Sequence, residues 1–225
     1  LYSAAWFPHL AAVVAALTEV LAPERVVLRL SRSVSGGFGL SDGDTLIGAP
    51  PAGPVLFRER GLTMEADVVH GQKTGHFLDQ RDNRTLVRGL ASGCDVLDVF
   101  ASTGGFALSA AAGGARSVHL VDLSAPAIAT AERNLAHNRR LTAVRACSVR
   151  TTVGDAFEVL DRLGRRAERD ADRFDLIVID PPSFAMNQAS VERALGAYAK
   201  LTRLGVALLR PGGLLMQASC SSRVS

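Results

Sequence analysis

Short apolar runs alternate with stretches of helical length between residues 95 and 220, and this alternation constrains the fold more than any other feature of the sequence. The apolar runs are "DVLDVF", "SVHLVD", "VRTTVGD", "FDLIVID" and "GGLLMQASC". Strands that alternate with helices of this length predict a parallel, doubly wound α/β sheet. Right-handed crossovers then place a ligand crevice at the carboxyl ends of the strands, where chemically informative residues are expected.

The first ninety or so residues lack this rhythm. A helix is predicted over residues 1–22 and ends at Pro23. The alternating run "RVVLRLSR" indicates a strand, and the glycine- and proline-broken stretch after it indicates two or three further short strands. We therefore expect a small α+β accessory domain at residues 1–70 and the domain with the parallel sheet at residues 71–225.

The first helix contains the apolar run "LAAVVAALTEVLA". A signal peptide is not expected, because no lysine or arginine precedes the run, Glu19 interrupts it, and no small-residue cleavage site leads into a polar mature start. The run is also too short to span a bilayer. We therefore expect an amphipathic helix and no membrane partner.

Composition adds few constraints. At 225 residues and 48% hydrophobic, the chain can bury a sizeable core, and a formal net charge of +3 does not by itself indicate a nucleic-acid binder. Lys73 and Lys200 are the only lysines. Arginine suits bidentate contact with phosphate, but a compositional bias of the source genome explains the same excess. Cys94, Cys147 and Cys220 form neither a metal-ligand pattern nor a disulfide framework, which favours a reducing cytoplasm.

The first strand of the sheet leads into a glycine loop in "LDVFASTGGF". Asp98 lies near the end of the strand, and Gly104 and Gly105 open the next helix. Glycines there let a ligand approach the backbone at the positive end of the helix dipole. The loop does not read as the dinucleotide pattern G-x-G-x-x-G, and an acid suits a cationic group better than a pyrophosphate.

Two further acids follow the next two strands. Asp122 ends the second strand, where it suits ribose hydroxyls, and Asp155 follows the third, where it suits an exocyclic amine such as that of adenine. Taken singly, either acid is explained equally well as a helix cap. Together with Asp98 they match a ligand with a cationic amino acid end, a ribose and an adenine but no phosphate. That description favours S-adenosylmethionine as the cofactor.

Two longer strings carry a family resemblance: "VIDPPSFA" at residues 178–185 and "HGQKTGHFLDQRDNR" at residues 70–84. With the glycine loop, the first string resembles class I S-adenosylmethionine-dependent methyltransferases. The second resembles the signature of the large-subunit ribosomal RNA methyltransferases, whose cytosine-5 members act on 23S rRNA. The resemblance is good over residues 60–225 and looser before them.

The resemblance implies a Rossmann-like class I methyltransferase sheet preceded by a small α+β domain. In the family, an RNA-binding PUA domain usually comes earlier still, and further strands follow the fifth. The chain begins at Leu1 rather than methionine and ends after the fifth strand. We therefore expect it to be part of a larger protein, with the last strands of the sheet missing and the fifth strand left as an open edge.

The resemblance also assigns residues to the site. The expected cofactor-binding residues are Asp98, Ala101, Ser102, Gly104, Gly105, Phe106, Asp122, Leu123, Asp155, Ala156 and Asp180, with Phe77, Gln80, Arg81 and Arg84 in a segment that closes over the cofactor. The expected substrate-binding residues are Pro181, Pro182, Ser183 and Phe184.

Cys220 and Asp180 are the expected catalytic residues, because both follow neighbouring strand ends. Cytosine C5 attacks a methyl sulfonium only after a thiolate adds to C6, and an acid near N3 or the amino group steadies the adduct. The family's cytosine-5 members carry a cysteine in a similar "SCS" context. Other cytosine-5 enzymes have a second cysteine after Pro-Pro, where this chain has Ser183, so the base that removes the C5 proton is not identified. The alternative for Cys220 is a small buried apolar side chain. Cys94 and Cys147 are expected to be inert.

Arginine groups at Arg139 and Arg140, and at Arg162, Arg165, Arg166 and Arg169, suit RNA phosphate or simply a solvated helix end. We favour the solvated interpretation.

The leading hypothesis is thus a cytoplasmic rRNA cytosine-5 methyltransferase that uses S-adenosylmethionine and ribosomal RNA, with no metal and with a homodimer left open. Two alternatives stay open: a methyltransferase of guanine N7, an amino group or a small molecule, which needs no cysteine; and an RNA-binding module with a vestigial pocket.

Overall fold

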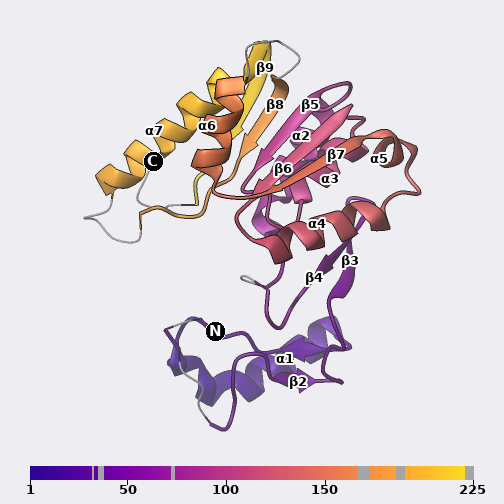
Figure 1. The fold of residues 1–225 in the computed structure, drawn as a ribbon. Helices are drawn as coiled ribbons and strands as arrows, with labels where there is room; N and C mark the ends of the chain where they lie inside the picture. The colour runs from indigo at the N-terminus through magenta and orange to yellow at the C-terminus, as the bar shows by residue number, and fades with distance from the viewer. Residues whose placement is uncertain (32, 35–37, 72–73, 167–172, 186–190, 221–225) are drawn as a thin grey trace. The chain divides into compact units, whose positions relative to one another are not determined.

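The computed structural model describes residues 1–220 except residues 32, 35–37, 72–73, 167–172 and 186–190. The chain divides into two compact units, which are described separately. The first unit is Leu1–Arg58 with Met64–Leu78, and the second is Glu59–Thr63 with Asp79–Ser225 (Figure 1). The domain boundary expected after residue 70 stays a prediction.

The first unit is a small α+β assembly. Its elements are the 3-10 helix η1 (Ala4–His9), the helix α1 (Leu10–Leu21), the strands β1 (Val26–Val27) and β2 (Thr45–Ile47), and most of the strands β3 (Val55–Glu59) and β4 (Leu62–Ala66). Its core is formed by Phe7, Leu10, Leu28 and Val34. The helix ends at a left-handed Ala22 (φ 43°), just before Pro23. The strand expected for "RVVLRLSR" is present, but among the described residues of this run it covers β1 alone, which is shorter than expected.

The helical segment Ala4–Leu21 corrects one expectation. The turn η1 extends the apolar helix to 18 residues, long and apolar enough to cross a membrane, whereas the run "LAAVVAALTEVLA" alone is too short. Most of the segment is exposed, including Trp6, Val20 and Leu21. Length and composition are weak grounds for a span, because core helices and signal sequences share them. The absence of a membrane partner is therefore still a prediction.

The second unit contains a parallel sheet in the order β7-β6-β5-β8-β9 (Figure 1). The strands are β5 (Asp95–Val99), β6 (Ser117–Asp122), β7 (Ser148–Val153), β8 (Phe174–Ile179) and β9 (Leu209–Gln217). The helices are α2 (Arg81–Leu90), α3 (Gly105–Ala112), α4 (Ala125–His137), α5 (Thr142–Ala146), α6 (Ala156–Arg166) and α7 (Val191–Ala207). The predicted parallel, doubly wound α/β fold is confirmed, and among the described strands β9 is an edge.

Apolar side chains on both faces of the sheet explain why helices cover it. On one face, the core contains Leu97, Val99, Val121, Ile177 and Ile179 of the sheet together with Val159 and Leu160 of α6 and Leu201 of α7. Alternate residues such as Val96 and Leu120 are also buried, and α3 and α4 pack near them. Strands buried on both faces read as continuous apolar runs, which is the pattern that predicted them. Ser124 caps α4 as expected, its hydroxyl accepting the Ala127 N–H at 3.3 Å.

Ion pairs tie together the amino ends of the strands. Arg116 donates to Asp95 at 2.7 Å, and Arg210 donates to Asp175 at 2.6 Å. Arg210 also lies 2.9 Å from Asp95. Hydrogen bonds from Arg116, Ser117 and Arg210 hold the pKa of the Asp95 carboxyl well below its usual range. At this end of the sheet, the carboxylates of Asp95 and Asp175 are therefore neutralised by arginine side chains.

Candidate active site

Acidic side chains gather at the carboxyl end of the sheet. Asp98 is the next-to-last residue of β5, Asp122 ends β6, and Asp180 directly follows β8. Strand register aligns Val99 with Val121 and with Ile179, so the three strands end at one level. Burial, together with the neighbouring charges of Asp180 and Asp122, raises the pKa of Asp98 to about 7. The three carboxyl groups are therefore electrostatic neighbours, as expected for one crevice.

One carboxyl oxygen of Asp98 has no hydrogen-bond donor among the described residues. The side chain is buried, and its Oδ2 accepts the Ala107 N–H of α3 at 2.9 Å. Its Oδ1 is buried without a hydrogen-bond partner among the described residues. An orphaned, desolvated carboxyl oxygen at a strand end suits a cationic donor supplied by a ligand, because such a donor would restore the lost hydrogen bond and charge balance. The amino group of S-adenosylmethionine fits this requirement.

The loop between β5 and α3 has an unusual backbone. Phe100 and Ser102 have left-handed φ values of 63° and 48°, and Gly104 follows with 76°. At Gly104 a Cβ would lie 2.6 Å from the Ala131 Cβ, so only glycine fits. The Ser102 N–H donates to Asp122 Oδ2 at 2.8 Å and holds the loop in place. Left-handed non-glycine residues are strained and cluster at ligand sites, so this loop is a candidate cradle for the cofactor.

Asp122 and Asp155 both accept local backbone hydrogen bonds. Asp122 Oδ1 accepts the Ser124 N–H at 2.8 Å. Asp155 Oδ1 accepts the N–H groups of Phe157 and Glu158 at 2.9 and 3.2 Å, at the start of α6. The helix-cap interpretation therefore describes Asp155 well, and Asp122 shapes the adjoining loops. A ligand role for either residue stays a prediction, as it does for the exposed Leu123 and the buried Ala156 and Phe106.

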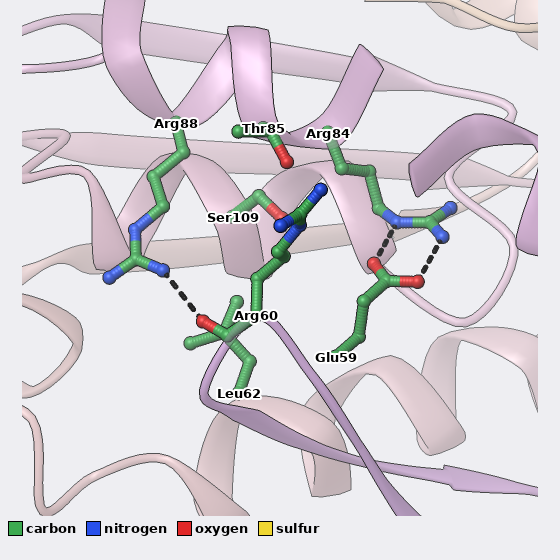
Figure 2. Close-up of a pocket in the computed structure, with 7 residues that line it drawn as sticks. All are labelled: Glu59, Arg60, Leu62, Arg84, Thr85, Arg88 and Ser109. Carbon is green, nitrogen blue, oxygen red and sulfur yellow. Dashed lines mark hydrogen bonds and ion pairs between the residues drawn. The ribbon is translucent and has the colours of Figure 1, made fainter. Parts of the chain in front are cut away.

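The residues expected to close over the cofactor lie in different surroundings. Gln80 donates from Nε2 to Asp180 Oδ1 at 3.2 Å, so it reaches the acidic cluster. Arg81 is exposed and lies 3.5 Å from Asp82. Arg84 is buried and donates to both carboxyl oxygens of Glu59 at 2.7 Å (Figure 2). Phe77 belongs to the first compact unit. Gln80 thus reaches the acidic cluster, whereas Arg84 is held by Glu59.

Cys220 lies beside Pro181, the residue that follows Asp180. The Ala218 N–H donates to the Ile179 carbonyl, and Cys220 Sγ lies 3.7 Å from the Pro181 carbonyl oxygen. The side chain of Cys220 is exposed, in contrast to the alternative of a buried apolar residue. The neighbouring Ser219 hydroxyl lies 3.1 Å from the hydroxyl of Tyr198 on α7, which ties this segment to the helix.

The other two cysteines have less reactive surroundings. Burial raises the pKa of the Cys147 thiol to about 11, and burial together with the Asp175 carboxylate raises that of Cys94. A thiol with a raised pKa carries less of the nucleophilic thiolate at neutral pH. Both observations agree with the expectation that these cysteines are inert.

The Pro-Pro segment follows the same strand end. Pro181 is buried, whereas Pro182 and Ser183 are exposed. Phe184 packs in an aromatic cluster, with ring centroids 5.1 Å from Tyr198, 6.3 Å from Phe157 and 6.5 Å from Phe100. The Phe184 ring is thus engaged by protein neighbours on several sides.

The arginine groups have ordinary surroundings where the structure describes them. Arg165 pairs with Asp161 one helical turn away at 2.6 Å, and its side chain is largely exposed. Arg139 and Arg140 are exposed after α4. Arg169 and Lys73 lie outside the described residues.

Comparison with known proteins agrees with this geometry. The family model described as S-adenosylmethionine-dependent methyltransferase matches residues 43–223. The chain belongs to this family. Its cofactor is S-adenosylmethionine, and a solved structure described as a methyltransferase complexed with SAH superimposes with a TM-score of 0.77 at 29% identity, over 96% of this chain and 53% of the other. A SAM-dependent methyltransferase from Streptococcus mutans gives a TM-score of 0.79 at 27% identity, over 100% of this chain and 55% of the other.

Curated relatives carry more specific names. The chain is 47% identical over its whole length to a ribosomal RNA large subunit methyltransferase of Deinococcus radiodurans, of which it spans 54%. It is 39% identical, over 78% of its length, to ribosomal RNA large subunit methyltransferase I of Pseudoalteromonas translucida, of which it spans 42%. The chain therefore spans about half the length of the curated relatives it matches.

Sequence reasoning missed Glu59. Its carboxylate is buried against Arg84, although the two residues are 25 positions apart in the chain. The string "ERG" at residues 59–61 carries a turn signal, since Gly61 favours a hairpin, but nothing in the string indicates a partner for the glutamate.

Proposed function

We propose that the protein containing this chain methylates C5 of a cytosine in large-subunit (23S) ribosomal RNA, with Cys220 as the nucleophile. The observation that carries the proposal is the exposed Cys220 thiol beside Pro181, directly after Asp180 at the carboxyl end of the sheet. The names of the relatives support ribosomal RNA as the substrate. We further propose a cytoplasmic location without metal or membrane; a homodimer stays open.

The bound cofactor supplies an electrophilic methyl group. Asp98, the 101–105 loop and Asp122 are the proposed residues that hold it, together with Leu123, Asp155, Ala156, Phe106, Gln80 and Arg81. The buried Asp98 Oδ1 supports this assignment, because it has no hydrogen-bond partner among the described residues while the other oxygen of the same carboxyl group accepts the Ala107 N–H of α3. These residues would hold the cofactor at the carboxyl ends of the strands, where Asp180 and Cys220 also lie.

Catalysis then follows from the residues of this chain. The Cys220 thiolate adds to C6 of the cytosine, and the electron pair of the C5–C6 bond moves onto C5. C5 then forms the new carbon–carbon bond to the methyl group, while the methyl–sulfur bond breaks with its electron pair left on sulfur and S-adenosylhomocysteine as the leaving group. Asp180, held by Gln80, steadies the pyrimidine through N3 or the amino group. A base takes the proton from C5, and the electrons of that C–H bond restore the C5–C6 double bond as the Cys220 thiolate leaves.

A trapping experiment tests the nucleophile. With RNA that contains 5-fluorocytosine, C5 carries fluorine instead of hydrogen, so the last step fails and protein and RNA stay covalently joined. The full-length protein and a Cys94→Ser control should both give a shifted band on a denaturing gel, and Cys220→Ser should not. Full methyl transfer by Cys220→Ser would overturn the proposal.

The packing of Phe184 weighs against an amino-group methyltransferase. Such enzymes use an aromatic ring after Pro-Pro to stack the target base, whereas here the ring packs against Tyr198, Phe157 and Phe100. The trapping experiment separates the two activities, because an amino-group enzyme does not need Cys220.

A further inference from the structure

A tight hairpin joins β3 and β4. Arg60 and Gly61 form its two-residue turn, with left-handed φ values of 50° and 85°, as a type I′ turn requires. The tip of the hairpin, Glu59–Thr63, packs with the second compact unit, which carries the parallel sheet. The rest of both strands belongs to the first unit.

Helices α2 and α4 fix this tip. The buried Asn138, which follows α4, accepts the Thr63 N–H at 2.9 Å and donates to the Thr63 carbonyl at 2.6 Å. From α2, Arg88 donates to the Arg60 carbonyl at 3.2 Å, and Asp82 lies 3.5 Å from the Arg60 guanidinium. Both the backbone and the side chains of the tip are therefore held in one place.

Glu59 and Arg84 form a buried, bidentate ion pair at the centre of this contact (Figure 2). Their side chains are 8% and 4% exposed, beside a cavity of about 30 Å³ that Leu62, Thr85 and Ser109 help to line. A buried ion pair is a poor source of stability, since well-packed apolar residues of the same size often serve as well. The pair therefore calls for an explanation other than stability.

Arg84 also touches the glycine loop. A Cβ built on Gly105, the first residue of α3, would lie 3.0 Å from the Arg84 Cδ. A Cβ on the preceding Gly104 would lie 2.6 Å from the Ala131 Cβ of α4. The two glycines are thus clamped between the Arg84 side chain and α4, and two residues further on the Ala107 N–H bonds to Asp98.

We propose that Glu59 and Arg84 are positioning residues for the cofactor: the ion pair holds the Arg84 side chain against Gly105 and so fixes the loop that receives S-adenosylmethionine. Arg84 acts through the glycine backbone rather than by touching the cofactor, which replaces the direct contact expected from the sequence. The inference rests on the assignment of the 101–105 loop to the cofactor in the proposed function.

Cofactor binding to the full-length protein tests this role. Calorimetric titration should show that Glu59→Gln and Arg84→Lys each weaken S-adenosylmethionine and SAH binding about tenfold, within the range usual for coupled sites. The KM for the cofactor should rise while kcat at saturating cofactor is kept. The matched control is Arg210→Gln, which removes an ion pair at the amino end of the same sheet and should change affinity by less than about twofold.

A second variant leaves the ion pair intact. Gly105→Ala places a methyl group against the Arg84 Cδ, so it should weaken cofactor binding in the otherwise unchanged protein. In an Arg84→Ala background the same change should add little, because the obstructing side chain is gone. Additive effects of the two substitutions on affinity would contradict the clamp.

The Asp98→Asn variant distinguishes two possible errors: a wrong positioning role for Glu59 and Arg84, and a wrong assignment of the 101–105 loop to the cofactor. If Asp98→Asn weakens cofactor binding and the folded Glu59 and Arg84 variants do not, the positioning role is wrong and the loop assignment stands. If none of them weakens binding, the loop assignment fails as well. The trapping of RNA by Cys220 is a separate result in either case.

Discussion

The acidic residues at the two ends of the parallel sheet differ in their partners and in the direction of their pKa shifts. At the amino end, Asp95 and Asp175 are paired with Arg116 and Arg210, and these contacts hold the pKa of Asp95 far below normal. At the carboxyl end, Asp98 keeps an unpartnered oxygen among the described residues, and its pKa is raised to about 7. The same residue type is therefore paired with arginine at one end, and at the other end it keeps the free oxygen that the proposed function assigns to a cationic ligand.

The largest expected effect is a loss of cofactor affinity when the buried carboxylate of Asp98 is removed from the carboxyl end. Asp98→Asn keeps the shape of the side chain but not its charge. Because a hydrogen bond to a charged group is worth about 1.5–3 kcal/mol, S-adenosylmethionine affinity should fall by about 10- to 100-fold. Isothermal titration calorimetry measures it. Unchanged affinity would remove Asp98 from the cofactor site.

The matching change at the amino end should affect stability instead. Arg210→Gln leaves Asp175 without its closest arginine contact, and we expect unfolding free energy to fall by about 1–2 kcal/mol. Cofactor affinity should stay the same. Denaturant unfolding and calorimetry on the same sample provide both values, and a loss of affinity equal to that of Asp98→Asn would abolish the contrast between the two ends.

The two ends should also differ in pH dependence. Asp98 has a folded-state pKa of about 7 against 3.8 in the unfolded chain, so it stabilises the fold below about pH 4 and loses that contribution as pH rises to about 7. Asp95 has a lowered pKa, so its contribution is present above pH 3.8 and is lost as pH falls below that value.

His119 opposes Asp98 in part of this window. Burial lowers its pKa from 6.5 to about 4, so its contribution is lost as pH falls from 6.5 towards 4. The contribution of Asp98 is therefore measured as the difference in the free energy of unfolding between the unchanged protein and the Asp98→Asn variant. That difference should fall between pH 4 and 7, by at most about 1.4 kcal/mol per pH unit. A flat difference in urea unfolding would show that Asp98 ionises normally.

The smallest expected effect concerns backbone strain at the carboxyl end. Ser102 has a left-handed φ of 48°, so Ser102→Gly should relieve strain, offset in part by the greater freedom of glycine in the unfolded chain. We expect a net gain of about 0.5 kcal/mol, or about 1–2 °C in Tm. Differential scanning calorimetry measures it, and a lower Tm would mean that the Asp122 contact already compensates the strain.

Much of the sheet was predictable because its signals are local. Apolar runs marked the five described strands of the parallel sheet, and Ser124 followed by Pro126 marked the start of α4. The proximity of Cys220 to the Asp180 strand end followed from parallel topology, since neighbouring parallel strands end on the same side.

What could not be predicted depends on contacts distant in sequence. Arg84 reads as a polar helix residue until Glu59 is placed beside it by the hairpin tip. The strand at "RVVLRLSR" stops early, and the Leu30 N–H donates to the Asp42 side chain, 12 positions further on, rather than to a strand partner. The left-handed Phe100 has no sequence signal, because non-glycine residues adopt this conformation only when their surroundings impose it.

In the proposed function, the carboxyl end of the sheet is the site of methyl transfer to cytosine, with Cys220 as the nucleophile. Mass spectrometry of the protein trapped on 5-fluorocytosine RNA, after protease and nuclease digestion, tests it most directly. We expect a methylated fluorocytosine attached to the peptide that contains Cys220. Methylated RNA without any adduct on that peptide, or an adduct on Cys94 or Cys147, would contradict it.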